Sequence, residues 1–455
     1  MTVEWATGEQ TTEPLTIIAA DSPVTCAIYA KDNDLLDKPG WKRFKKLAKK
    51  YKKLLTHANK AKIRNFGRIK IKYGFEVPYD YHQAMKLDAK NKNTKWKDAI
   101  ELEMKHIFGY KVFKDMGKGY VMSDDFKKIR VRLVFDVKHD GRHRARLVAG
   151  GHLTDEPDDS TYSGVVSLRG FRLLVFLAEL NGLETWATDI ASAYLEAYTS
   201  EKVYIIAGPE FGDLEGHVLV IDRALYGLRT SGQRWHDRLA ACLRNEGFTP
   251  SRVEPDLWLR PNGDVYEYIG VYVDDLAFAI KNPQAFVDTL TSKYNFKVKG
   301  TGPIQFHLGA DFEREADGTL VMSPTKYIAR MVQTYERFYG CKPSTRALSP
   351  LEPNDHPELD ESELLDDEGI QQYQSLIGCL QWSISLGRFD ISVAVASMSS
   401  YRAAPRRGHL DRVKRICGYL YKMKDAKLHF RTHAPDYSGI LVEKPNWSSI
   451  YGNVK

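Results

Sequence analysis

Two adjacent aspartates, Asp274 and Asp275, stand between two apolar stretches of this 455-residue chain. Residues 264–273, before the doublet, follow the turn signal Pro261-Asn262-Gly263, which is typical of a β-hairpin. Residues 276–280, after it, are again apolar and strand-like. The doublet is therefore expected at a sharp turn between two buried strands, which constrains the fold to a sheet with carboxylates at one edge.

Like charges a few ångströms apart repel, and a low dielectric sharpens the repulsion. Arginine or lysine partners, proton uptake or a divalent metal would compensate a buried doublet, and clustered hard oxygen ligands suit magnesium. A solvent-exposed acidic turn would need no compensation. Asp189, at the end of the strand predicted for residues 184–188, would add a third carboxylate. Such carboxylates suit two bridged metal ions, which activate an attacking hydroxyl and stabilise a leaving phosphate.

A second hairpin is predicted for residues 131–148, with its turn at His139-Asp140-Gly141. Strand alternation would put Arg142, Arg144 and Arg146 on one face. A row of guanidinium groups suits a phosphate chain lying across it. Three exposed arginines on a solvated strand edge are the alternative.

Helical periodicity predicts three helices that serve as packing elements. They cover residues 94–107, residues 170–180 ended by Asn181-Gly182, and residues 231–243 followed by Gly247 as a stop. At this length, with 43% hydrophobic residues, we expect two or more subdomains around separate cores.

Composition excludes several protein classes. No run of about 18 apolar residues suggests a membrane span, and the N-terminus lacks a basic and then apolar leader pattern. The five cysteines are far apart, odd in number and without metal-ligand spacing, which argues against a disulfide framework and a zinc site. No Walker-type glycine loop or His-Glu-x-x-His motif occurs. We expect no membrane partner.

The net charge of +7 is unevenly distributed. Basic residues are concentrated between Lys42 and Lys72, whereas residues 352–368 are acidic. The basic segment is interpreted as an arm for polyanions, or equally as a solvated helix with Leu47, Leu54 and Leu55 on its other side.

Seven short blocks follow one another over residues 130–420: RARLVAGG at 144–151, TDIASAYL at 188–195, LYGLR at 225–229 with Trp235 beyond it, YVDD at 272–275, FHLG at 306–309, YQSLIG at 373–378 and RFDI at 388–391. This ordered set closely resembles the reverse transcriptases of copia-type LTR retrotransposons. The family usually has Gln and Pro where this chain has Thr230 and Gly232, so the local nucleotide pocket is expected to differ in detail.

The resemblance implies an RNA-directed DNA polymerase in which a primer 3′-hydroxyl attacks the α-phosphorus of a dNTP. Asp189 and Asp274 would be the principal ligands of two Mg²⁺ or Mn²⁺ ions, with Asp275 completing the triad and the Ile190 carbonyl adding an oxygen. Tyr194 would be the steric gate that excludes a ribose 2′-hydroxyl, and a core tyrosine is the alternative.

The resemblance also assigns binding residues, for several of which packing roles remain open. The nucleotide-binding set is Arg144, Arg146, Tyr194, Tyr226, Gly227 and Arg229. The primer or template set is Tyr272, Phe306, Leu308 and Gly309.

The implied fold is α+β, a right-hand polymerase of fingers, palm and thumb with an antiparallel palm sheet and a basic N-terminal extension. Residues 1–90 would be that extension, a connector that follows integrase, and residues 95–345 the fingers and palm. An acidic linker is expected at 346–372 and a thumb or connection region at 373–455. A ribonuclease H domain is expected to be absent.

Expected partners are an RNA or DNA template-primer, dNTPs and other parts of the retrotransposon polyprotein, in a cytoplasmic virus-like particle or the nucleus. A catalytically inactive nucleic-acid-binding remnant of a polyprotein is the second hypothesis. A DNA-templated or template-independent polymerase with the same palm is the third, and template preference would separate it.

Overall fold

The computed structural model describes residues 2–4, 10–12, 14–16, 19, 23–49, 70–72, 74–138, 140–157 and 160–434. It divides into two compact units, one of residues 1–102 and 133–146 and the other of residues 103–132 and 147–455. Much of the basic segment, at residues 50–69, lies outside the described residues, as do the turn residue His139 and the predicted thumb beyond residue 434.

The N-terminal part of the first unit has a small core of its own. Helix α2 (Pro23–Asp32) and the short 3-10 helix η1 (Lys42–Phe44) contribute Cys26, Ala27 and Phe44 to it. The later elements of this unit are the antiparallel pair β3 (Lys70–Lys72) and β4 (Phe75–Val77), helix α4 (Tyr81–Asn91), the start of α5 (Lys95–Gly109), and the hairpin of β7 (Val131–Val137) and β8 (His143–Ala149).

Helix α5 confirms the helix expected at residues 94–107, and its Trp96 joins it to the hairpin. Trp96 is buried, with its ring edge-on to Phe135 and His143. Asp88 accepts hydrogen bonds from the Trp96 and Lys97 amides, which satisfies donors at the start of the helix.

The hairpin confirms the predicted alternation within β8. Ala145 and Leu147 are buried whereas Arg144 and Arg146 are half-buried on the opposite face. Arg142, predicted on the same face as these arginines, directly precedes the strand, and its Nε lies 2.7 Å from Asp140 Oδ2.

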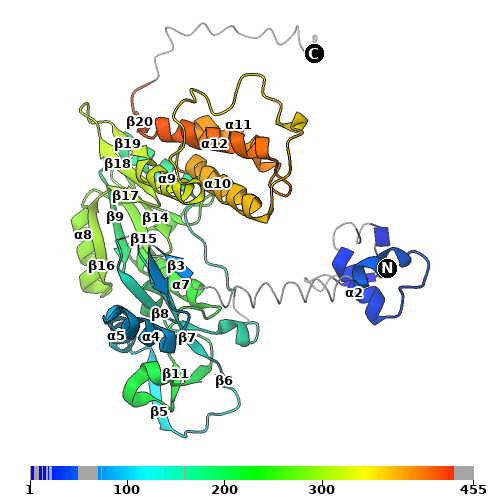
Figure 1. Ribbon diagram of the computed structural model, residues 1–455. Helices are drawn as coiled ribbons and strands as arrows, with labels where there is room; N and C mark the ends of the chain where they lie inside the picture. Colours follow the sequence, from blue (N-terminus) through cyan, green and yellow to red (C-terminus); the bar gives the residue numbers. More distant parts are fainter. Residues whose placement is uncertain are drawn as a thin grey trace. The chain divides into compact units, whose positions relative to one another are not determined.

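A six-stranded antiparallel sheet forms the centre of the second unit (Figure 1), in the order β12-β13-β14-β15-β9-β16. Its strands are β9 (Thr185–Ile190), β12 (Thr249–Pro250), β13 (Leu257–Asn262), β14 (Val265–Tyr272), β15 (Asp275–Ala279) and β16 (Val298–Pro303). Asn262 pairs with Val265, so the turn expected at residues 261–263 is made by Gly263 and Asp264. The turn lies later because Pro261 and Asn262 already pair with Tyr266 and Val265 in the hairpin.

The sheet separates two hydrophobic cores. Helix α7 (Ser231–Asn245) packs with Leu276 and Phe278 on one face, whereas α6 (Leu168–Leu180) packs with Ala277 and Ala279 on the other. Alternate residues of one strand therefore enter different cores, which explains the continuous apolar run in the sequence. The two helices confirm those predicted at 170–180 and 231–243.

Two further sheets and a helical bundle complete the second unit. One sheet contains β5 (Phe113–Lys118), β11 (His217–Ile221), β10 (Val203–Ile206) and β6 (Lys127–Lys128), with β6 parallel to β10. The other contains β17 (Phe306–His307), β18 (Ala310–Arg314), β19 (Leu320–Ser323) and β20 (Leu428–Phe430). The bundle contains α9 (Thr325–Tyr339), α10 (Asp367–Ser385), α11 (Ser392–Ser399) and α12 (Arg407–Lys422) around a third core (Figure 1). The expected mixture of helices with antiparallel sheets is confirmed.

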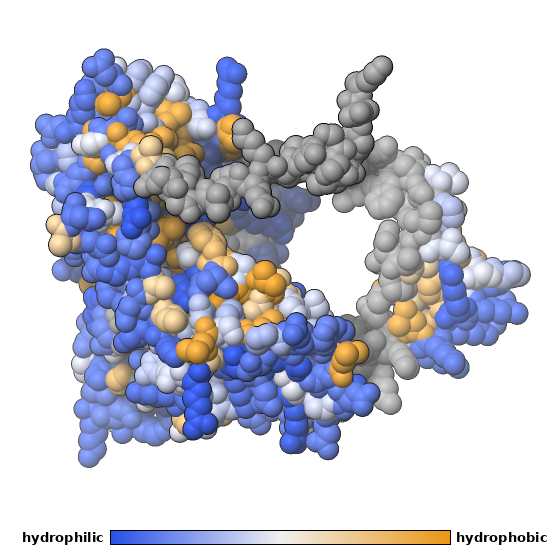
Figure 2. Space-filling model, turned by 90° about the horizontal axis from the view of Figure 1, so that it is seen from above, coloured by the Kyte–Doolittle hydropathy of each residue, from blue (hydrophilic) through white to orange (hydrophobic). Residues whose placement is uncertain are grey.

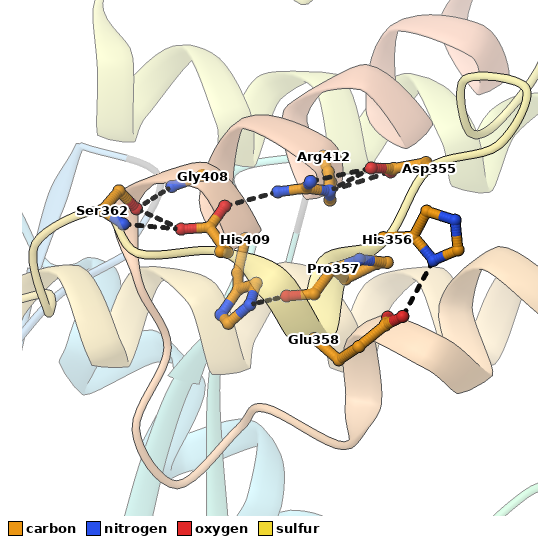
Figure 3. Close-up of polar contacts among 9 residues, drawn as sticks. Asp355, His356, Pro357, Glu358, Ser362, Gly408, His409 and Arg412 are labelled. Carbon is orange, nitrogen blue, oxygen red and sulfur yellow. Dashed lines mark hydrogen bonds and ion pairs between the residues drawn. The ribbon is translucent and has the colours of Figure 1, made fainter.

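The acidic residues between α9 and α10 pack along α12 (Figure 3). The Arg412 guanidinium lies 2.7 Å from Asp355 Oδ1 and 2.6 Å from Asp360 Oδ2. The buried His409 ring bonds the Pro357 carbonyl oxygen through Nε2 at 2.9 Å. This acidic segment therefore stabilises the bundle through specific ion pairs.

In the described part of the chain, no helix is both long and apolar enough to cross a bilayer. The face seen in Figure 2 is mostly hydrophilic, and its hydrophobic residues lie in separate patches.

Candidate active site

The aspartate doublet lies at a two-residue turn between β14 and β15. Tyr272 pairs with Asp275, which leaves Val273 and Asp274 as the turn residues. The expected turn is confirmed, although Asp275 already belongs to β15. Val273 has a φ of 59°, a left-handed conformation that is strained for a β-branched residue.

Asp189 meets this turn from the neighbouring strand. It lies within β9 rather than after it, and it pairs directly with Asp275. The next amide, that of Ile190, donates a 2.8 Å hydrogen bond to the Asp274 carbonyl oxygen. Backbone pairing therefore brings the three predicted aspartates together, and it uses the Ile190 amide to fix the turn.

The clustering of the three carboxylates affects protonation at the site. Burial and, after it, the neighbouring Asp274 and Asp189 carboxylates raise the pKa of Asp275 to about 6, against the opposing charge of Lys299. Lys299 lies opposite Asp189 in β16, and its Nζ is 3.0 Å from Asp189 Oδ1. Lys299 therefore offsets part of the negative charge of Asp189 and Asp275, and such clustered carboxylates favour cations.

The donor atoms of the site fit a divalent metal in their chemistry. Within the described residues, no group of three or more His, Cys, Asp or Glu side chains is arranged to hold a metal ion. The donors nevertheless suit a hard cation, because they are carboxylates on two neighbouring strands and their connecting turn, where burial and then the neighbouring carboxylates raise the pKa of Asp275.

Tyr194 and Tyr226 lie together, in segments that follow β9 in the chain. Tyr194 belongs to the 3-10 helix η3 (Ala193–Glu196), which follows β9 after Ser192 in a left-handed conformation. Its ring centroid is 5.2 Å from that of Tyr226. Both side chains are half-buried, so Tyr194 is neither fully exposed nor a fully buried core residue.

The loop that carries Tyr226 is closely packed on the end of β8. The Ala149 amide donates to the Tyr226 carbonyl at 2.7 Å, and the Arg229 Nε donates to the Gly151 carbonyl at 3.0 Å. Gly227 has a φ of 93°, and a Cβ there would lie 2.3 Å from the Ala149 carbonyl oxygen. Only glycine fits at this position.

The predicted primer block forms the β17–β18 hairpin. Leu308 and Gly309 are its turn residues, with φ values of 48° and 90°. Leu308 packs against the core that Tyr272 also contacts, whereas Phe306 is exposed. This places Leu308 and Tyr272 against one hydrophobic core.

The predicted arginines are assigned to the other unit. Arg144 and Arg146 belong to the first unit, whereas the aspartates, the tyrosine pair and the β17–β18 hairpin belong to the second.

Sequence reasoning missed two contacts of the site. Trp235, interpreted as a packing residue, donates a 2.7 Å hydrogen bond from its indole nitrogen to the Val273 carbonyl oxygen. Lys299 was not singled out, because a lysine in an alternating strand gives no signal of its partner. The position of Trp235 after the LYGLR block was the available signal for the first contact.

Comparison with known proteins gives consistent matches. Residues 120–348, half of the chain, match the family described as reverse transcriptase (RNA-dependent DNA polymerase). The retrovirus-related Pol polyprotein from transposon RE1 of Arabidopsis thaliana is 29% identical over 315 residues, covering 68% of this chain and 20% of that protein. A transposon Ty5-1 protein of Saccharomyces cerevisiae is 28% identical over 251 residues, covering 54% of this chain and 78% of its own length. The polyprotein from transposon RE2 of Arabidopsis thaliana is 26% identical over 315 residues, which cover 68% of this chain and 20% of that protein.

Proposed function

Because the chain belongs to the copia-type reverse transcriptase family, we propose that it is an RNA-directed DNA polymerase that extends a primer by nucleotidyl transfer from dNTPs. The observation that carries the proposal is the direct pairing of Asp189 with Asp275 beside the turn that holds Asp274. The chain spans about a fifth of the length of the two Arabidopsis polyproteins, so the activity is proposed for this part alone.

Asp189, Asp274 and Asp275 would hold two Mg²⁺ or Mn²⁺ ions, and the Ile190 carbonyl would add an oxygen. When bound, the metal ions supply positive charge that favours the deprotonated primer hydroxyl and the leaving pyrophosphate. The protein's part is to fix the carboxylates. The β9–β15 pairing and the Ile190 amide hold their backbones before any ligand binds.

Nucleotide selection would depend on the tyrosine pair. Tyr194, supported by the Tyr226 ring, would exclude a ribose 2′-hydroxyl. Gly227 and Arg229 would line the nucleotide or template side. Arg144 and Arg146 share one strand face, and their guanidinium groups suit the triphosphate of a dNTP.

The primer would be held by Tyr272, Phe306, Leu308 and Gly309. Tyr272 directly precedes the turn, and Phe306 exposes an aromatic ring suited to nucleic-acid contact. The six-stranded sheet would be the palm, the α9–α12 bundle a thumb, and residues 1–90 a basic connector. Other partners would be further parts of the polyprotein, in a cytoplasmic particle or the nucleus.

The test is extension of a DNA primer on a poly-rA template with Mg²⁺ or Mn²⁺. Wild type should extend, whereas Asp274→Asn should lose extension while retaining template-primer binding, because the substitution removes a metal ligand without changing the shape of the side chain. Asp264→Asn is the matched control. It lies in the exposed turn of the adjacent hairpin and should extend normally.

Two outcomes would count against the proposal. Wild type that binds the template-primer and never extends it would favour the inactive nucleic-acid-binding remnant. Extension on a DNA template but not on the RNA template, or extension without a template, would favour a different polymerase activity.

A further inference from the structure

The turn between β14 and β15 is held from outside the hairpin at both of its carbonyl groups. The Asp274 carbonyl oxygen accepts the Ile190 amide at 2.8 Å. The Val273 carbonyl oxygen accepts the Trp235 indole N–H at 2.7 Å. Neither bond is part of the β14–β15 ladder, so each fixes an orientation that the hairpin alone leaves open.

The conformation of Val273 explains why such fixing is needed. A positive φ at the first residue of a two-residue hairpin turn is a position that glycine usually occupies. Here a β-branched residue adopts a φ of 59°, which stores strain that the turn can release by rotating its peptide planes. The peptide plane between Val273 and Asp274 also sets the direction of the Asp274 side chain.

Trp235 is itself rigidly placed. It is 1% exposed and lies edge-on to Phe296 in the core that also contacts the Val273 side chain. The next residue, His236, bonds Asp256 Oδ1 at 2.6 Å, and the Asp256 carbonyl accepts the Val271 amide in β14. Helix α7 is therefore tied to β14 two residues before the turn as well as at the turn.

We propose that Trp235 is a positioning residue whose indole N–H fixes the peptide plane between Val273 and Asp274 and thereby directs the Asp274 carboxylate. The inference rests on the proposed polymerase function. Because Trp235 is 1% exposed, it would act on the site through its hydrogen bond to the backbone of the turn.

Trp235→Phe removes the N–H and keeps an aromatic ring in the core. Trp258→Phe is the matched control, because Trp258 is 2% exposed in the same core and its indole nitrogen has no hydrogen-bond partner among the described residues. Both variants should lose thermal stability, as both create a small cavity. Only Trp235→Phe should affect the turn.

Steady-state extension kinetics separate the two roles. Trp235→Phe should lower kcat by about tenfold or more and raise the half-saturating Mg²⁺ concentration, because misdirection of a ligand affects the reacting geometry. The dNTP KM and template-primer Kd should stay within about twofold, since the binding surfaces are unchanged. Equal kinetics in Trp235→Phe and Trp258→Phe would overturn the proposal, as would a loss confined to template-primer Kd.

A second measurement is independent of catalysis. In ¹⁵N-tryptophan-labelled protein, the Trp235 indole resonance is identified by its disappearance in Trp235→Phe. It should exchange slowly with solvent and shift when Mg²⁺ alone is titrated, whereas the Trp258 resonance should not shift. An unshifted Trp235 resonance would overturn the positioning role. Wild type that fails to extend while this resonance responds would refute only the polymerase function.

Discussion

Asp189 and Asp275 face each other as direct partners across β9 and β15. Directly paired residues in an antiparallel sheet have Cβ atoms about 4.5–5.5 Å apart on one face, so the two carboxylates cannot avoid each other. The repulsion between the two carboxylates therefore follows from the way the two strands pair. It explains why the site favours a cation.

The first prediction concerns Asp275→Asn in metal-free protein. The folded-state pKa of Asp275 is raised from 3.8 to about 6, so the contribution of Asp275 to the unfolding free energy should fall as pH rises from about 4 to about 6. At pH 7.5 the variant should be more stable than wild type by on the order of 1 kcal/mol, after allowance for solvent screening. Urea unfolding of both proteins in a chelator measures this. A stability difference between wild type and variant that stays constant from pH 4 to pH 6 would contradict the prediction.

The second prediction concerns Lys299→Gln. Because Lys299 Nζ lies 3.0 Å from Asp189 Oδ1, it competes with a metal ion for that carboxylate. The variant should therefore bind Mg²⁺ about two- to fivefold more tightly, as expected for loss of an exposed ion pair. Calorimetric titration measures the change. Lys297→Gln is the control, because that lysine lies over the Tyr110 ring, and an equal effect there would point to net charge alone.

The third prediction concerns His307, which is 4% exposed and lies 4.8 Å from the Phe171 ring. Burial lowers the pKa of His307 to about 4, so the folded protein keeps it neutral where the unfolded chain takes up a proton. The contribution of neutral His307 to the unfolding free energy is fully present above about pH 6.5. It is lost as pH falls toward 4, by about 1.4 kcal/mol per pH unit at most. His307→Phe should flatten this part of the stability profile. Parallel profiles in variant and wild type would refute it.

The fourth prediction compares two arginines of α12: Arg412, which is drawn in Figure 3, and Arg407. Arg412→Gln should destabilise the protein by about 2–3 kcal/mol, because it leaves the largely buried Asp355 and Asp360 carboxylates without their partner. Arg407→Gln should change stability by less than about 0.5 kcal/mol, since its ion pair with Glu363 is exposed on both sides. Chemical unfolding of both variants tests the comparison, and equal losses would refute it.

The fifth prediction compares two glycines with positive φ. Gly227→Ala places a Cβ 2.3 Å from the Ala149 carbonyl oxygen, whereas Gly182→Ala meets no atom within 4 Å. The first should cost about 2–4 kcal/mol and the second about 1 kcal/mol, because only the first adds a backbone clash to the conformational penalty. Thermal unfolding measures the loss of stability in both variants. Similar losses would mean that the loop around Gly227 moves to accept the added methyl group, which would contradict the prediction.

Local patterns predicted much of this structure. Apolar runs located β14 and β15, and helical periodicity located α6 and α7. Each pattern could be interpreted correctly because the apolar residues that form it are the ones buried in the structure. Burial on both faces of the sheet follows from the continuous apolar runs. The aspartates converge as expected because each lies where a predicted strand ends.

Other features depended on contacts that sequence patterns do not encode. The Trp235 bond to Val273 joins residues 38 positions apart, and the indole N–H could have bonded any nearby carbonyl. The ion pair of Arg142 with Asp140 was also not predicted, because alternation along a strand does not reveal a partner in the turn. The ion pairs of Arg412 were missed because acidic residues between helices have the same composition whether they are solvated or packed.

The division of β15 between two cores has a consequence for folding fidelity. A slip of one residue along β9 would exchange Phe278 for Ala277 against α7, and it would force an aromatic ring into the space that Gly270 and the alanines leave for α6. The sizes of side chains several residues away from the aspartates thus favour the correct alignment of β15 with β9. Once β9 and β15 are aligned in this way, the carboxylates of Asp189 and Asp275 lie opposite each other before any metal or nucleic acid is present.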